Sequence, residues 1–222
     1  MTVLHLADEG EAADLAAFLS RLLHYDRGAA VRLQAAGTAL AVFGRPPSFE
    51  VLAIRAVRLA KPYENGLDVT LDVTVSAGEL LESVDESAAT AVVPGAVTGP
   101  PWAGVLPPRG GWRPVPGLPA PDALRAMIGA GVAEFRSRTE ELAAERRTRA
   151  ELDRVGREIW SRTVGDTHLP MRAVHAAQSL GFLRATRELA LFSSGAWLRL
   201  RTPYGSIAVR RAGLGTLDVS VR

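Results

Sequence analysis

The sequence predicts an α+β fold made of two pseudo-repeated lobes, each a four-stranded antiparallel meander with flanking helices. Three observations support this prediction. Residues 30–75 and 187–222 both alternate apolar and polar side chains with a period of two, which is typical of strands with one solvated face. Residues 94–121 are rich in Pro and Gly. Residues 122–162 have helical periodicity and many charges, so the lobes should be joined by a connector and a long charged helix.

The two sheet-forming stretches have the same turn chemistry, which indicates an internal duplication. Each has a glycine at its first tight turn, in Ala36-Gly37 and in Ser194-Gly195. Pairing outward from these turns sets Leu33 opposite Leu40 in the first copy, and the equivalent leucines opposite each other in the second. The two sheets could pair edge to edge into one larger sheet, which would protect strand edges that otherwise invite aggregation.

The N-terminal lobe is expected to span residues 1–92. A short strand at residues 3–6 should precede a helix at residues 11–24, whose Leu and Phe side chains recur at helical spacing. The alternating segment 67–75 is predicted to form the fourth strand of the first sheet. Ser76 and Glu79 have capping-box spacing, so a second helix should begin at Ala77.

Residues 93–120 form the predicted connector. Trp102 and Trp112 lie between prolines, and tryptophan is rare in flexible linkers. We therefore expect an extended segment that packs on the lobes with its rings buried. A docking motif for the proline-binding groove of a partner is the alternative.

Residues 121–165 form the predicted long helix. Glu134 and Arg138 are one of several pairs of opposite charge at i,i+4, which stabilise a solvated helix. The thin apolar seam in its middle argues against a strong long coiled coil. A helical hairpin or an antiparallel helix contact remains open. The C-terminal lobe, residues 166–222, should begin with a helix from Pro170 to Leu180 that ends at Gly181.

The outward face of the second sheet carries the candidate binding residues. Apolar side chains alternate onto one face of this sheet, and Leu217, Val219 and Val221 are expected to form its last strand. Glu188 is expected to lie opposite Arg201 as a cross-strand charge pair. The opposite face combines aromatic rings with arginines, whereas the first copy has small or polar residues there. The candidate site residues on this face are Phe192, Trp197, Arg199, Arg201 and Arg210, with Asp218 and Arg222 beside them.

Composition limits the other classes of function. The chain has 222 residues, 47% of them hydrophobic, and no cysteine, which fits a reducing compartment. No signal peptide and no apolar run of membrane length is present, so we expect a cytoplasmic protein without membrane contact. Residues 1–92 hold 7 basic and 13 acidic side chains, and residues 93–222 hold 19 and 11, although the net charge is only +2. This polarity favours contact between unlike halves, within one molecule or between subunits.

No motif for nucleotide binding, metal binding or nucleophilic catalysis is present, so we expect no cofactor and no metal. The first hypothesis is therefore a non-catalytic protein-binding or scaffold role, with a second copy (a homodimer) or another protein as partner. The second is nucleic-acid binding, with bases stacked on the rings and phosphates on the arginines of the second sheet. The third is an enzyme with a site between the lobes at Asp166, His168 and His175. Coverage of the aromatic face by the long helix, the connector or another subunit is the structural alternative to any binding site there.

Overall fold

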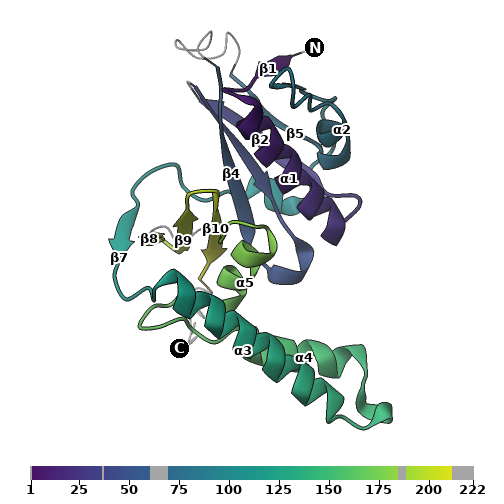
Figure 1. Cartoon of the computed structure of the whole chain (residues 1–222), viewed down its shortest axis with the longest axis vertical. Coiled ribbons are helices and arrows are strands. Elements are labelled where there is room, and N and C mark those ends of the chain that lie inside the picture. Colours follow the sequence, from purple (N-terminus) through teal and green to yellow (C-terminus); the bar gives the residue numbers. More distant parts are fainter. Residues whose placement is uncertain (1, 37, 61–69, 185–188, 212–222) are drawn as a thin grey trace, which may run out of the picture.

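A single eight-stranded antiparallel sheet forms the centre of the protein. The computed structural model describes residues 2–36, 38–60, 70–184 and 189–211. Its strands run in the order β5-β2-β3-β4-β10-β9-β8-β7 (Figure 1). These strands are β2 (Ala30–Ala36), β3 (Ala39–Gly44), β4 (Leu52–Arg58), β5 (Asp72–Ser76), β7 (Arg113–Val115), β8 (Ala190–Ser194), β9 (Trp197–Thr202) and β10 (Gly205–Arg210). Together with five α-helices, this sheet confirms the predicted α+β class.

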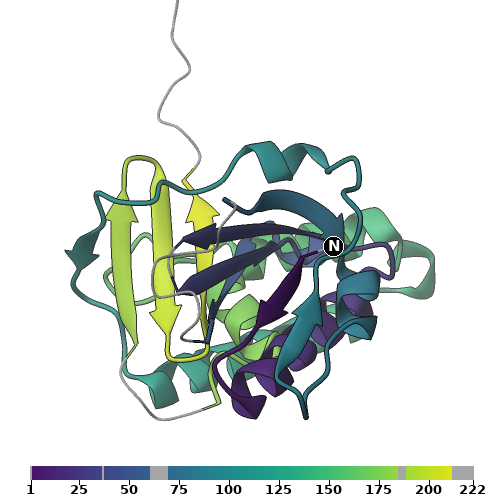
Figure 2. The same ribbon diagram turned by 90° about the horizontal axis from the view of Figure 1, so that it is seen from above.

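Helices and connector lie on opposite faces of the sheet. α1 (Glu9–Tyr25) contacts β4 and α5 (Met171–Ser179) contacts β10 on one face. The connector with its short helix η3 (Pro101–Gly104) crosses the other face (Figure 2). A separate two-stranded sheet pairs β1 (Val3–His5) with β6 (Thr90–Val92), and α2 (Ala77–Glu82) packs against α1.

Local side-chain bonds set where the N-terminal helices begin. Asp8 accepts a hydrogen bond from the backbone N–H of Glu11 at 2.8 Å, so α1 begins at Glu9, two residues before the predicted start. Ser76 accepts one from the N–H of Glu79 at 3.3 Å, which confirms the predicted start of α2 at Ala77.

The two halves of the sheet correspond strand by strand. β2 pairs with β3 as an antiparallel hairpin, and β8 pairs with β9 in the same way. Each pairing is centred one residue later than predicted, so Leu33 faces Val42 instead of Leu40, and Leu191 faces Leu200. Because this error shifts each pairing by two residues, every side chain stays on its predicted face.

The correspondence extends to the junction between the halves. Arg58 ends β4 opposite Ala39, and Arg210 ends β10 opposite Trp197, so Ile54 and Ser206 occupy equivalent positions. The antiparallel β4–β10 register places Ile54 directly opposite Ser206. Two equivalent residues that face each other mark a pseudo-two-fold axis normal to the sheet. This symmetry supports the predicted duplication, and the β4–β10 pairing confirms the predicted edge-to-edge joining.

The fourth strand of each half differs from a simple meander. β5 returns to pair with β2, so the first half has the order 4-1-2-3 of a Greek key. In the second half the matching place beside β8 is taken by β7, which comes from the connector. The predicted last strand at Leu217, Val219 and Val221, and the predicted partner Glu188, lie outside the described residues.

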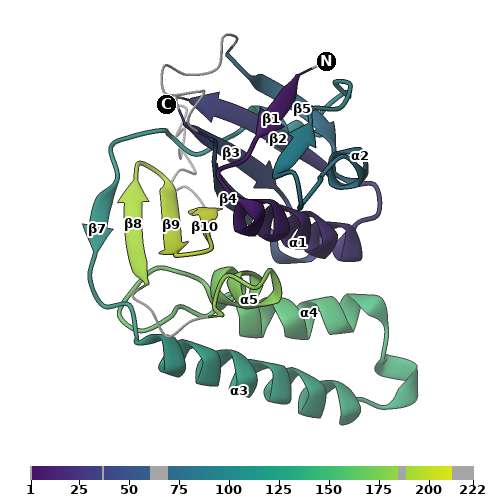
Figure 3. The same ribbon diagram turned by 45° about the horizontal axis from the view of Figure 1, so that its top comes forward.

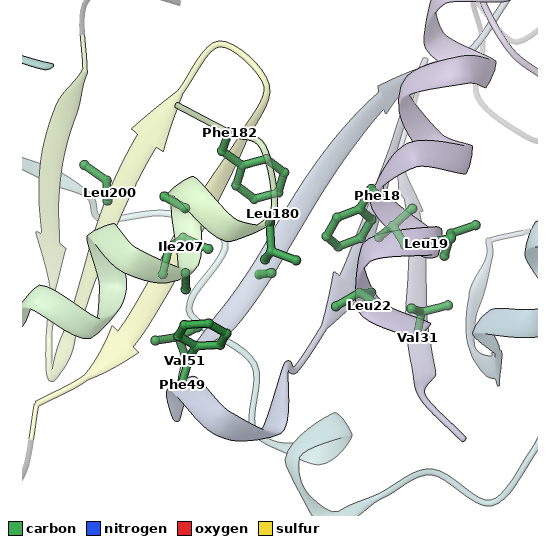
Figure 4. Packing of buried hydrophobic residues seen from close by; sticks show 14 of the residues in the cluster. Phe18, Leu19, Leu22, Val31, Phe49, Val51, Leu180, Phe182, Leu200 and Ile207 are labelled. Atoms are coloured by element: carbon green, nitrogen blue, oxygen red, sulfur yellow. The ribbon is translucent and has the colours of Figure 1, made fainter. Parts of the chain in front are cut away.

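One hydrophobic core extends under both halves of the sheet. Phe18 of α1 and Phe182, just after α5, stack with ring centroids 5.7 Å apart, and Leu200 and Ile207 continue the core beneath α5 (Figure 4). Gly205 of β10 lies against Phe182, and a Cβ atom there would come within 2.5 Å of the ring. The two lobes are therefore packed as one body.

The prediction of a single long helix was wrong, and the helical hairpin left open is the structure found. α3 (Pro121–Glu140) and α4 (Arg149–Trp160) lie antiparallel beyond the sheet, with the short helix η4 (Ala144–Arg146) between them (Figure 3). The predicted pair Glu134–Arg138 forms. Arg138 of α3 also binds Glu158 of α4 at 2.8 Å. Arg162, two residues after α4, binds Glu134 of α3 at 2.7 Å, so ion pairs link the two arms of the hairpin. Folding back also buries Val155, which one continuous helix would carry away from the core.

A buried arginine joins the two halves beside the pseudo-two-fold axis. Arg55 of β4 is 5% exposed, and its Nη2 donates to Glu11 and Asp14 of α1 at 3.1 Å each. Its Nη1 donates to the carbonyl oxygen of Tyr204, in the β9–β10 turn, at 2.7 Å. Arg184 binds Asp14 from the C-terminal half at 3.1 Å. One buried guanidinium therefore ties α1, β4 and the second hairpin together.

We expect Arg55→Leu to lower the free energy of unfolding by about 3 kcal/mol, because Glu11 and Asp14 lose their buried counter-charge. Chemical denaturation measures this change. Arg58→Leu is the matched control, since Arg58 binds Asp8 and Glu11 from the same strand but its side chain is 69% exposed. Equal losses in the two variants would contradict a special role for the buried arginine.

Candidate functional site: the arginine face

The sheet register brings the predicted site residues onto one surface. Phe192 of β8 faces Arg199 of β9, and Trp197 of β9 faces Arg210 of β10. Arg201 follows Arg199 by two positions and shares its side of the strand. We call this surface, with Trp112 described below, the arginine face.

The connector adds a residue that the sequence prediction did not assign to the site. β7 pairs with β8 and places the Trp112 ring 5.7 Å from the Arg199 guanidinium. The indole Nε1 of Trp112 donates to the carbonyl oxygen of Pro108 at 3.0 Å, which fixes the ring. Arg201 lies over Phe192 at 5.6 Å in a second cation–π contact. The sequence predicted that Trp112 packs on the lobes but not that it contacts Arg199, because a three-residue strand containing Pro114 has no strand periodicity.

The connector also covers the middle of the same side of the sheet. Phe43, Ile54 and their buried neighbours form a second, smaller apolar cluster, and Trp102 and Leu106 pack on it together with Trp197. The expected packing of the connector is therefore present, although its two tryptophans are half-buried and not fully buried. In this central part the connector covers the sheet, as the alternative to a binding site expected. Arg201 and Arg210 lie beyond it and are exposed.

The charge on the arginine face has no counter-charge among the described residues. Arg199 is half-buried, and burial, followed by the positive charge of Arg201, lowers its pKa below the ordinary arginine value. The Nε atom of Arg199 is buried without a hydrogen-bond partner. Within the described ranges, no carboxylate forms an ion pair with Arg199, Arg201 or Arg210. An anion bound at the accessible part of this face would relieve the repulsion between the Arg199 and Arg201 guanidinium groups.

The aromatic rings of this face are already engaged. Guanidinium groups lie over Trp112 and Phe192, and Trp197 packs at the edge of the small cluster. Stacking a nucleobase on the guanidinium-bearing side of Trp112 or Phe192 would require these contacts to be broken. The face therefore offers cations supported by rings, which suits carboxylate or phosphate groups better than bases.

The residues of the third hypothesis are not gathered into a buried polar site. Asp166 and His168 are exposed in the segment between α4 and α5. His175 is half-buried on α5, where its ring lies 4.3 Å from Trp160 and 5.1 Å from Phe49, measured between centroids. In the part of the chain that the structure describes, no group of three or more His, Asp or Glu side chains could hold a metal ion.

Comparison with protein families divides the chain at the connector. Residues 1–104 match a domain of unknown function, DUF8010, and residues 107–214 match a second domain of unknown function, DUF8185. No curated protein matches the chain. The two matches meet where the connector passes from the first half of the sheet toward the second, so the halves are recognised as separate units of sequence.

None of the helices described is both long enough and apolar enough to cross a lipid bilayer.

Protonation of His175 should destabilise the fold. Burial lowers the pKa of His175 below its ordinary value of 6.5, so the unfolded chain takes up this proton first as the pH falls. The stabilising contribution is therefore complete above about pH 6.5 and is lost progressively below it. Chemical denaturation of the wild type and His175→Phe at about pH 7 and pH 5 measures the effect. The variant should lose less stability than the wild type over this interval, and identical losses would contradict the prediction.

Proposed function

We propose that the protein has a non-catalytic, protein-binding function and uses the arginine face to recognise an acidic segment of a partner. The residues that carry this role are Phe192, Trp197, Arg199, Arg201 and Arg210, with Trp112 from the connector. The cytoplasmic setting expected from the sequence is part of the same proposal.

The observation that carries the proposal is the unmatched charge of Arg199. A half-buried guanidinium with a donor lacking a partner, next to the second cation of Arg201, is costly without an anion. Trp112 and Phe192 restrain both arginines before a partner arrives, so less side-chain entropy is lost on binding. Aromatic and arginine side chains are also the types enriched where protein partners bind most strongly.

Nucleic acid remains the second candidate, and the geometry favours it less. Its recognition by stacking needs free rings, but those of Trp112 and Phe192 face guanidinium groups. A carboxylate-bearing segment needs only the exposed edges of the cations. An acidic protein segment therefore fits the face as it stands.

A second copy of the chain is one acidic partner to examine. The loop after α2 and the helix itself carry exposed acids without a basic neighbour in contact among the described residues, namely Glu79, Glu82, Asp85 and Glu86. The association of such a surface with the arginine face would give an oligomer that weakens with salt. Light scattering at low and high salt distinguishes this case from a different partner.

We expect Arg201→Glu to weaken binding of a labelled glutamate- and leucine-rich peptide by about tenfold or more, because an attraction becomes a repulsion. Fluorescence anisotropy measures the affinity. Arg201 is exposed, so the substitution should leave the unfolding transition in place. Arg136→Glu is the matched control: it makes the same change of net charge at an exposed position on α3, away from the face.

Equal weakening by Arg201→Glu and Arg136→Glu would contradict the proposal, since it would indicate attraction to overall charge. Tighter binding of single-stranded DNA than of the peptide at equal salt, lost in Trp197→Ala, would replace it with the nucleic-acid function.

A further inference from the structure

A groove separates the helical hairpin from the body of the protein, away from the arginine face. It has a volume of about 960 Å³, and residues from α4, α5, α3 and the loop containing the short helix η1 (Pro47–Phe49) line it. This volume lies in the range of small-molecule sites. No residue of the arginine face lines this groove. Of Asp166, His168 and His175, only His175 does so.

The floor of the groove is aromatic. The rings of Trp160 and His175 lie 4.3 Å apart and are tilted by 30°, and Phe49 meets His175 edge-on at 5.1 Å. Gly131 of α3 lies directly against the Trp160 indole, where a Cβ atom would come within 3.0 Å of the ring. Helix α3 therefore holds the indole in place.

The hollow exists because one helix position lacks a side chain. Gly156 lies on α4 one turn from Leu152 and one turn from Trp160, and all three line the groove. A Cβ atom at Gly156 would meet Phe135 and Trp160 at 3.6 and 3.7 Å, which is ordinary contact. A larger side chain would enter the groove without displacing backbone.

The rim supplies positive charge. Arg157 and Arg172 line the groove, and neither forms an ion pair with a carboxylate within the described residues. The Nε atom of Arg172 is buried and lacks a hydrogen-bond partner. Arg154, by contrast, is bound to Glu151 at 2.6 Å, so its charge is already compensated. Three acids also line the groove. Asp153 and Glu158 are paired with Arg149 and Arg138, so only Glu50 stands against the charge of Arg157 and Arg172 within the described residues.

We propose that this groove binds a small aromatic organic anion, with its ring on Trp160 and His175 and its carboxylate or sulfonate held by Arg157 and Arg172. The stacked and edge-on rings of the floor present aromatic edges and outer faces to a ring system, and offset and edge-on ring contacts add to the burial of apolar area. The unpaired guanidinium groups suit a single anionic group at one end. The hollow left by Gly156 gives the depth that such a ring requires.

The experiment titrates the full chain with 1-anilinonaphthalene-8-sulfonate and follows probe fluorescence, with 2-naphthoate as competitor. We expect saturable binding of one probe per chain, displaced by 2-naphthoate. Gly156→Leu should weaken binding at least about tenfold because leucine occupies the hollow, and Arg172→Gln should weaken it severalfold by removing the charge.

Gly129→Leu is the matched control, because Gly129 lies on α3 with open space around its Cβ position. It should leave the affinity unchanged, as should Arg201→Glu, whose effect belongs to the arginine face alone. Near-ultraviolet circular dichroism confirms that each variant keeps its packed core, since the probe also binds loosened cores. The proposal is overturned if the wild type shows no saturable binding, or if Gly156→Leu and Gly129→Leu change the affinity equally.

Discussion

The antiparallel pairing of β4 with β10 is the interaction on which the rest of the structure depends. It joins two four-stranded halves into one sheet, with the equivalent residues Ile54 and Ser206 opposite each other. Because both strands are interior, neither half presents an open edge at the junction. Arg55 secures the junction from the helical side, since it binds α1 and the β9–β10 turn at once. The single core beneath the sheet follows from this pairing.

The two copies share their interiors and differ in their outward side chains. The turn correspondence makes Ala41 of the first copy equivalent to Arg199 of the second, and Ala39 equivalent to Trp197. The interior is constrained because α1 and α5 must pack on it in the same way. On the exterior, Arg199 and Trp197 of the second copy replace two alanines, whereas the guanidinium and ring of the first copy, Arg32 and Phe43, face each other across β2 and β3. One interior position also diverged, because the buried cation Arg55 of the first copy corresponds to Ile207 of the second.

Local patterns predicted the elements well, and contacts distant in sequence explain the differences. Alternation located β8, β9 and β10, and the Ser76–Glu79 spacing located the start of α2. The predicted strand register was wrong by two residues, because alternation does not fix the position of a glycine within a tight turn. The helical break near η4 was missed because ion pairs such as Arg138–Glu158 link residues twenty positions apart, which no i,i+4 pattern contains.

For the candidate site, strand periodicity correctly placed the five predicted residues on one face of the sheet. The contact of Trp112 with Arg199 and the groove at Gly156 depend on tertiary packing, which no local sequence pattern predicts.

The most direct test of the single-body account is the cooperativity of unfolding in urea. All four tryptophans lie between residues 102 and 197, so their fluorescence reports on the connector and the C-terminal half. Backbone amide signals of β2 and β3, followed by nuclear magnetic resonance, report on the N-terminal half. Because β4–β10 pairing and one core couple the halves, both probes should give the same midpoint and the same slope. Loss of either set of signals at a clearly lower urea concentration would show two independent lobes and contradict the account.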